Sequence, residues 1–140
     1  MKILLAVDGS PYTKKMLAYL TTHDELFGIK NDFTVLTVQP PLPPRARAAV
    51  GKDVVQGYYA EETDKILAPV SAFLAQNGIN AKTEWKIGHA GETIAQYADE
   101  GKFDLLIMGS HGHSALGNLV MGSVTTQVLA HSKLPVLLVR

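Results

Sequence analysis

Three glycines and one serine in the last third of the chain have a spacing that suits the binding of an anion. Gly109 ends a short apolar run, Gly112 follows it, and after nine further residues Gly122-Ser123 begins a segment with a helical pattern. Glycine lets the backbone approach a phosphate closely and adopt positive φ, so that successive N–H groups can converge on the oxygens. The first turn of the following helix and the Ser123 hydroxyl would offer further donors. The spacing therefore predicts a phosphate site made mostly of backbone.

This loop differs from two widespread phosphate-binding motifs. No lysine follows the glycines as in a Walker loop, and the gap of nine residues excludes the dinucleotide pattern Gly-x-Gly-x-x-Gly. Between Ser110 and Gln127 the chain has no lysine or arginine, so His113 and Asn118 are left as donors without fixed charge. We therefore expect little neutralisation of phosphate charge by side chains.

Polar residues near the loop allow other interpretations as well. Asp8 ends the first apolar run, where it would either contact a ligand or cap the turn into the next helix. His111 and His113 could ligate a metal, but their spacing suggests no third ligand and the chain has no cysteine. The loop region also carries three serines near histidines: Ser110, Ser114 and Ser123. Because the Gly-x-Ser-x-Gly elbow of hydrolases is absent, we expect no serine nucleophile. Because no third ligand is indicated, we expect no metal held by the protein alone.

Five strand-like segments alternate with helical ones, which predicts parallel β-α-β units. Four of them are continuous apolar runs, typical of strands that helices cover on both faces: residues 3–7, 33–38, 105–108 and Val136–Val139. The segment 79–87 alternates apolar and polar side chains and should be an edge strand. In such a sheet, ligands bind beyond the carboxyl ends of the strands, where Asp8, Val38 and Gly109 would meet.

Helical patterns separate the strands. The first helix should open at Ser10-Pro11, and the second has an apolar stripe from Tyr59 to Leu74 and should end at Gly78. A third helix fits residues 92–100 and a fourth fits residues 124–132. Four prolines within residues 40–47 predict an extended loop, which could form a flap over the site.

Composition narrows the class of protein. With 140 residues, 46% of them hydrophobic, the chain suits one domain over residues 1–140. Thirteen basic residues balance thirteen acidic ones, so no net charge favours nucleic acid as a partner. The first apolar run is too short for a signal peptide, and no run approaches the roughly 18 residues of a membrane span. We therefore expect no nucleic acid or membrane partner, and the lack of cysteine fits a cytoplasmic protein.

At these residues the sequence resembles the universal stress protein family, whose ATP-binding members carry glycine, two residues, glycine, nine residues, glycine and Ser or Thr. The likeness runs from the strand before Asp8 to the final Pro135-Val136-Leu137. It implies an α/β fold with a single open five-stranded parallel sheet in the order 3-2-1-4-5 and helices on both faces. It also implies binding of ATP, ADP or AMP, with Mg²⁺ accompanying the nucleotide. The implied binding residues are Ala6, Val7, Asp8, Val38, Met108, Gly109, His111, Gly112, Gly122, Ser123 and Val124.

The resemblance implies a stress-response module that binds a nucleotide to regulate its contacts, with no catalytic step required. Two alternatives are a slow ATPase or nucleotidyl-transfer enzyme, and a dimeric scaffold with a vestigial pocket. An enzyme needs a positioned base and strong charge neutralisation, whereas a scaffold would not need the complete glycine pattern. The apolar strand Val136–Val139 would lie at an unprotected sheet edge, so we expect a homodimer in which two copies pair through it, as the resemblance also implies.

Overall fold

A five-stranded parallel sheet lies at the centre of the structure, a computed structural model that describes residues 1–28, 30–113 and 120–140. Its strands pair in the order β3-β2-β1-β4-β5, which confirms the predicted order and the edge position of β3. The chain adds strands first on one side of β1 and then on the other, so the order reverses between β1 and β4. The strands are β1 (Lys2–Ala6), β2 (Asp32–Gln39), β3 (Lys82–Ile87), β4 (Leu105–Gly109) and β5 (Val136–Val139).

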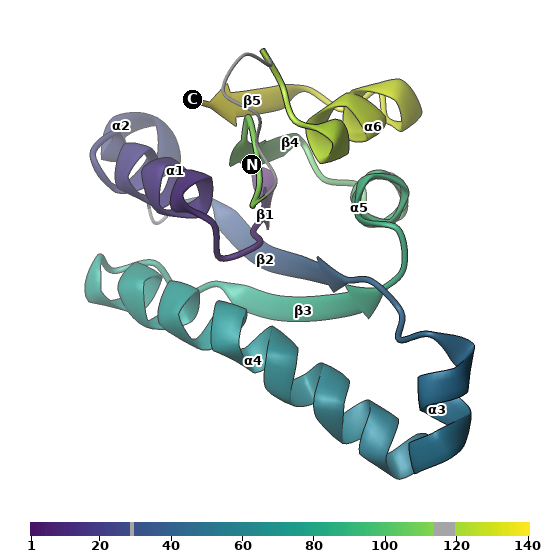
Figure 1. The fold of residues 1–140 in the computed structure, drawn as a ribbon. Coiled ribbons are helices and arrows are strands. Elements are labelled where there is room, and N and C mark those ends of the chain that lie inside the picture. Colours follow the sequence, from purple (N-terminus) through teal and green to yellow (C-terminus); the bar gives the residue numbers. More distant parts are fainter. Residues whose placement is uncertain (29, 114–119) are drawn as a thin grey trace.

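Helices cover both faces of the sheet (Figure 1). One face carries α1 (Pro11–Thr21), α2 (Asp24–Phe27) and α4 (Lys52–Gln76). The other carries α5 (Ala90–Glu100) and α6 (Ser123–His131). The short helix α3 (Pro44–Val50) has no buried residue and lies against the first part of α4, which extends beyond the sheet. Among the helices that the structure describes, none is both long and apolar enough to cross a membrane.

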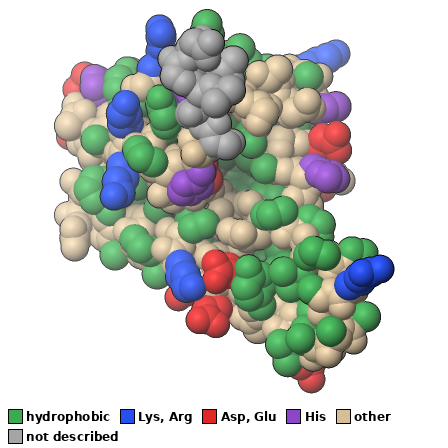
Figure 2. All heavy atoms as spheres, viewed as in Figure 1, with side chains coloured by type: hydrophobic (Ala, Val, Ile, Leu, Met, Phe, Trp, Pro, Cys, Tyr) green, Lys and Arg blue, Asp and Glu red, His purple; other side chains and the backbone are tan. Residues whose placement is uncertain are grey.

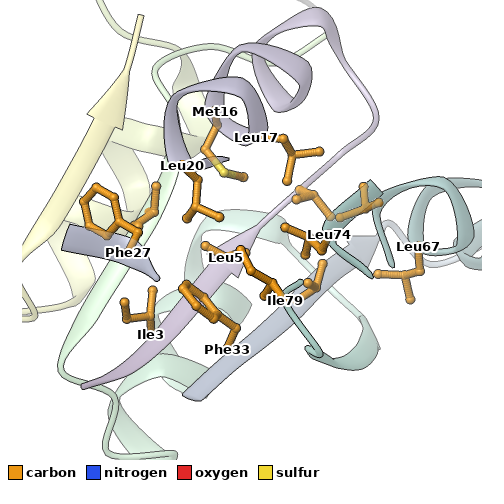
Figure 3. Packing of buried hydrophobic residues seen from close by; sticks show 14 residues of the cluster. Ile3, Leu5, Met16, Leu17, Leu20, Phe27, Phe33, Leu67, Leu74 and Ile79 are labelled. Atoms are coloured by element: carbon orange, nitrogen blue, oxygen red, sulfur yellow. The ribbon is translucent and has the colours of Figure 1, made fainter. Parts of the chain in front are cut away.

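Each face of the sheet has its own hydrophobic core, because successive side chains of a strand point to opposite faces. Ile3 and Leu5 of β1 face α1 and α4, together with Phe33 of β2 (Figure 3). Leu4 and Ala6 of β1 face α5 and α6. Both faces of the central strands are therefore buried, as the continuous runs in the sequence predicted, although β2 also buries the polar Thr34 and Thr37.

Both edge strands differ from their predictions. The prediction that helices cover β5 on both faces holds only in part: its side chains pack against both cores, but all four are only half-buried. The prediction that the other edge strand begins at Ile79 is wrong, because pairing with β2 begins at Lys82. Gly78 has φ of 79° and ends α4, and the Ile79 N–H donates to the Leu74 carbonyl at 2.9 Å. This helix-ending hydrogen bond keeps the buried Ile79 outside the strand.

The proline-rich segment is only partly the predicted loop. Residues 40–43 have no regular structure, and the Leu42 N–H donates to the Tyr59 hydroxyl at 2.8 Å. From Pro44 onward the chain is helical, so the extended loop predicted for residues 40–47 is wrong in its second half. Pro44 occupies the first turn of α3, where a missing N–H is tolerated, and arginines and alanines that favour helix follow it. The sequence patterns did not predict the short helix α2.

Candidate functional site

A cavity of about 280 Å³ lies at the carboxyl end of the sheet, where the order of strands reverses. Figure 2 shows the hollow on the face turned to the reader, below the grey residues. Its walls come from β1, β2, β4, the starts of α5 and α6, and the loop after β4. All of the implied binding residues lie around it: Ala6, Val7, Asp8, Val38, Met108, Gly109, His111, Gly112, Gly122, Ser123 and Val124. The structure thus brings together segments that are far apart in the sequence.

Asp8 caps the turn from β1 into α1. Its Oδ1 accepts hydrogen bonds from the Ser10 N–H at 2.9 Å and from the Thr13 hydroxyl at 3.0 Å. The Thr13 oxygen in turn accepts from the Asp8 N–H at 3.1 Å. Oδ2 lies toward Gly112, where an added Cβ would be 2.7 Å from it. The capping interpretation of Asp8 is therefore confirmed, and its second oxygen lies at the cavity.

The glycines of the loop allow neighbouring atoms to approach their Cα closely, and they do not have unusual backbone angles. None of the three motif glycines has positive φ, so that part of the prediction is wrong. A Cβ on Gly109 would lie 2.6 Å from the Tyr12 Cβ, and one on Gly122 would lie 3.2 Å from the His111 Cα. The Gly122 N–H also donates to the Ser110 carbonyl at 2.8 Å. The loop thus folds back on the start of α6 through contacts that a side chain would obstruct.

The N-terminus of α6 faces the cavity with Ser123, Val124 and Thr125 in its first turn. Gly122 is the N-cap, and none of the side chains that the structure describes caps this end. By helix geometry, the first N–H groups of α6 have no partner within the helix and carry the positive end of its dipole. The Thr125 hydroxyl donates to the Ser110 carbonyl at 3.1 Å and joins the helix to the loop. This arrangement can hold an anion.

Two histidines lie on the loop side of the cavity. His113 Nε2 is 2.7 Å from the Asp8 carbonyl oxygen, a contact that joins the loop to the turn after β1. His111 Nδ1 is 2.9 Å from the Ser110 hydroxyl, and the His111 ring centroid is 5.0 Å from that of Tyr12. The opposite wall of the cavity is apolar and includes Val38 of β2.

Sequence reasoning did not assign five of the lining residues to the site. His113 was predicted only as a neutral donor, and Thr13 lies on the first predicted helix, five residues after Asp8. The helical stripe from residue 92 missed the start of α5, which begins at Ala90. A helix that follows an edge strand returns over the sheet, and its first turn therefore lies at the carboxyl edge. The unassigned residues are Thr13, Ala90, Ile94, His113 and Thr125.

The structure also bears on the alternative chemistries. The Ser110 hydroxyl contacts His111, but Ser110 is only 2% exposed and cannot attack a substrate. Ser114 and Asn118 lie outside the described residues. Within residues 1–28, 30–113 and 120–140, no three His, Cys, Asp or Glu side chains come together as metal ligands. Arg47 lines a separate groove beside Lys52 and Tyr59 instead of the cavity.

Comparison with known proteins gives one family. The model of the Universal stress protein family matches residues 1–140. A universal stress protein of Thermus aquaticus is 30% identical over 139 residues, which cover 99% of this chain and 97% of that protein. Slr1230 of Synechocystis is 34% identical over 140 residues, or 99% of this chain, but the chain spans only 42% of the length of Slr1230.

Solved structures give the same fold. That of MJ0577, from Methanocaldococcus jannaschii, has a TM-score of 0.81 and 27% identity, and the match covers 99% of this chain and 94% of that one. Universal stress proteins in complex with cAMP, from Archaeoglobus fulgidus with dAMP, and from Arabidopsis thaliana with AMP have TM-scores of 0.69, 0.67 and 0.66. They are 22%, 20% and 18% identical, and the matches cover 100%, 100% and 99% of this chain and 97%, 98% and 90% of theirs. The chain belongs to the Universal stress protein family.

Proposed function

We propose that the cavity binds an adenine nucleotide and that the chain acts as a cytoplasmic regulatory module in the stress response. The observation that carries this proposal is the meeting of the Asp8 turn, the glycine loop and the α6 N-terminus around one cavity. Three solved structures of the same fold contain cAMP, dAMP or AMP, which supports an adenine nucleotide as the ligand. In this proposal, bound nucleotide sets what the chain contacts, and no turnover is required.

The walls suggest how a nucleotide would lie. Adenine would lie against the apolar side formed by Val38, Ile94 and Met108, because aromatic bases bind in apolar clefts with few polar groups. The ribose would approach Asp8, and the phosphates would extend toward Gly112 and the α6 N-terminus. A volume of about 280 Å³ is near the lower limit of ligand pockets, so the base and ribose fill it and the phosphates reach along the loop.

Mg²⁺ would accompany a di- or triphosphate rather than bind to the protein alone. Asp8 supplies the one carboxylate among the described lining residues, and its Oδ1 already accepts two hydrogen bonds. Mg²⁺ prefers six oxygen ligands and is commonly held by one or two carboxylates together with phosphates. These residues do not fit a protein-held magnesium site.

We favour binding without turnover over a slow ATPase or nucleotidyl transferase. A hydrolase needs a base that activates water and charge that stabilises the phosphate in the transition state. Among the described lining residues there is no lysine or arginine, and Asp8 Oδ1 is occupied by the turn. A scaffold with a vestigial pocket would have no need for the close contacts of Gly109, Gly112 and Gly122.

The proposal is tested by identifying the nucleotide that the protein retains and by measuring nucleotide affinity. Native mass spectrometry of the purified protein should detect retained adenine nucleotide, and calorimetric titration of nucleotide-free protein with ATP, ADP and AMP should give one site per chain. Phosphate release should stay far below the roughly 1 to 100 per second of kinases. Failure of all three nucleotides to bind would refute the proposed function, and turnover in that range would favour the enzyme.

We propose in addition that two copies pair through β5. This strand is an edge of the sheet, and its four apolar side chains are half-buried in the single chain. Exposed edges normally carry charge, proline or a covering element. Antiparallel pairing of two β5 strands across a two-fold axis would protect both edges and bury the uncovered parts of Val136 and Leu138.

Light scattering tests this assembly. The parent should have the mass of a dimer at micromolar concentration, whereas the double variant Val136→Lys, Leu138→Lys should be a monomer because it places charge in the paired surface. The control is the single variant Thr83→Lys in β3, at the opposite edge of the sheet, which should stay dimeric. A monomeric parent would refute the pairing.

A further inference from the structure

The part of the cavity proposed for phosphates has no fixed positive charge. Its described lining contains no lysine or arginine, and the titratable side chains in that lining are Asp8, His111 and His113. Residues 114–119 lie outside the described residues, but their sequence, Ser-Ala-Leu-Gly-Asn-Leu, adds no charged side chain. Positive charge can therefore reach bound phosphate in this lining through the histidines. Histidine is the side chain whose protonation changes between about pH 5 and 8.

The hydrogen bond of His113 determines which tautomer its neutral ring adopts. A carbonyl oxygen only accepts hydrogen bonds, so Nε2 donates its hydrogen to the Asp8 carbonyl, 2.7 Å away. In the neutral ring Nδ1 then has no hydrogen. A proton added at Nδ1 creates a second N–H and a positive charge while the bond to Asp8 is kept. The protonated ring can remain in place and donate to an anion.

His111 precedes His113 by two residues and contacts Ser110 and Tyr12. Its Nδ1 is 2.9 Å from the Ser110 hydroxyl, and its ring lies 5.0 Å from the ring of Tyr12 on α1. A cation, Lys15, lies on the same helix, and its Nζ is 4.7 Å from the centroid of the Tyr12 ring. Asp8 in the turn after β1 is the anion. The lining residues of the remaining elements do not titrate: Val38, Ala90, Ile94, Met108, Ser123, Val124 and Thr125.

We propose that phosphate binding in this cavity is coupled to proton uptake by His111 and His113. The inference rests on the proposed function and adds its regulation. A bound phosphate stabilises the charged imidazolium, so the complex holds protons more tightly than the empty protein. By mass action, affinity for phosphorylated adenosine rises as the pH falls from about 8 to about 5.5. Affinity for adenosine, which has no phosphate, stays constant over this range.

The test uses cAMP and adenosine as the probes. The phosphodiester of cAMP keeps one negative charge throughout this range, whereas a phosphate monoester such as that of AMP titrates near about pH 6 and would confuse the result. Calorimetric titrations at both pH values should show cAMP binding roughly tenfold more tightly at the lower pH, the gain expected when a neutral donor to phosphate becomes charged. Adenosine affinity should change less than about twofold.

Proton uptake gives a second readout that does not depend on the affinity. Binding of cAMP near about pH 6.5 should take up a fraction of a proton or more, measured from the observed heats in two buffers of different ionisation enthalpy. The double variant His111→Gln, His113→Gln should lose this uptake and the pH dependence of cAMP binding. His131→Gln is the matched control, since His131 contacts Gln127 and Glu92 on the helix surface and should leave both readouts unchanged.

The outcomes separate this inference from the proposed function. If neither adenosine nor cAMP binds at either pH, the adenine site itself is refuted and the coupling with it. If cAMP binds equally well at both pH values without proton uptake, the site stands and the coupling is overturned. A pH dependence that survives in the double variant overturns the assignment to these histidines.

Discussion

The loop after β4 and the arm formed by residues 44–58 both contain glycine, but their glycines have different surroundings. In the loop, a Cβ on Gly112 or Gly122 would come within 2.7 Å of a carboxylate oxygen or 3.2 Å of a backbone carbon. In the arm, a Cβ on Gly57 or Gly51 would meet no atom within 4 Å. Glycine is required by packing at the cavity, whereas at Gly51 the requirement is the backbone, with φ of 86°.

The two regions also differ in charge. The arm carries Arg45, Arg47 and Lys52 together with exposed apolar side chains such as Val54, which is 58% exposed. Figure 2 shows the arm as a mostly hydrophobic projection with a basic side chain at its margin. The cavity has no such cation in its described lining. The glycine loop therefore lines a cavity without lysine or arginine among its described lining residues, while Arg47 and Lys52 line a separate groove.

The largest expected effect follows from the packing contrast. Gly122→Val places side-chain atoms against the backbone of Ser110, His111 and Gly112, so it should reduce nucleotide affinity by about 100-fold or more. Gly57→Val is the matched control, because the same exchange on α4 meets open space and should leave affinity within about twofold. Calorimetric titration measures both variants. Equal losses in the two would show that the effect does not come from the loop, and unchanged affinity in Gly122→Val would remove the loop from the site.

A second effect concerns the carboxylate that Gly112 approaches. Asp8→Ala removes the acceptor for the Ser10 N–H and the Thr13 hydroxyl and should lower the free energy of unfolding by about 1 to 3 kcal/mol. Asp8→Asn keeps an oxygen acceptor at Oδ1 and should lose less than Ala. Urea denaturation measures both variants. An alanine variant as stable as the parent would show that the turn does not depend on this cap.

Much of the fold could be predicted because it depends on local patterns. Continuous apolar runs indicated strands buried on both faces, and glycines marked the ends of helices. The residues that line the cavity could largely be predicted, because the resemblance rests on the same glycines. What could not be predicted depends on contacts distant in sequence. His113 lies 105 residues from Asp8 along the chain, and no periodicity in either segment indicates that the two meet.

The two wrong predictions of secondary structure, after Pro44 and at Ile79, also have local causes. Prolines favour an extended chain but also begin helices, and the alanines and arginines after Pro44 decide for the helix. The alternation that begins at Ile79 suits a strand, but the bond from its N–H to Leu74 belongs to the end of α4. In both places two local rules compete, and the neighbouring element determines the result.

A smaller effect should appear in stability. Gly57→Ala in the middle of α4 adds a methyl group in open space and removes backbone freedom from the unfolded chain, so it should raise the free energy of unfolding by about 0.5 to 1 kcal/mol. The same exchange at Gly112 should lower stability, because the new Cβ would lie 2.7 Å from Asp8 Oδ2. Thermal unfolding of both variants measures the difference. Changes of the same sign would contradict the contrast between the two regions.

The smallest expected effect tests the separation of charge. Arg45 is exposed on α3, and Arg47 lines the groove between α3 and α4 with Pro44, Lys52 and Tyr59. Because this groove and the cavity share no lining residue, the double variant Arg45→Gln, Arg47→Gln should change ATP affinity by less than about twofold at moderate ionic strength. Exposed charges farther apart than about 8 to 10 Å are largely screened at physiological salt, so a direct contact would be needed for more. The comparison of ATP with adenosine is the control, since only ATP could gain from arginine. A loss of about tenfold for ATP with adenosine unchanged would mean that the arm closes over the cavity and supplies the cations that its lining lacks.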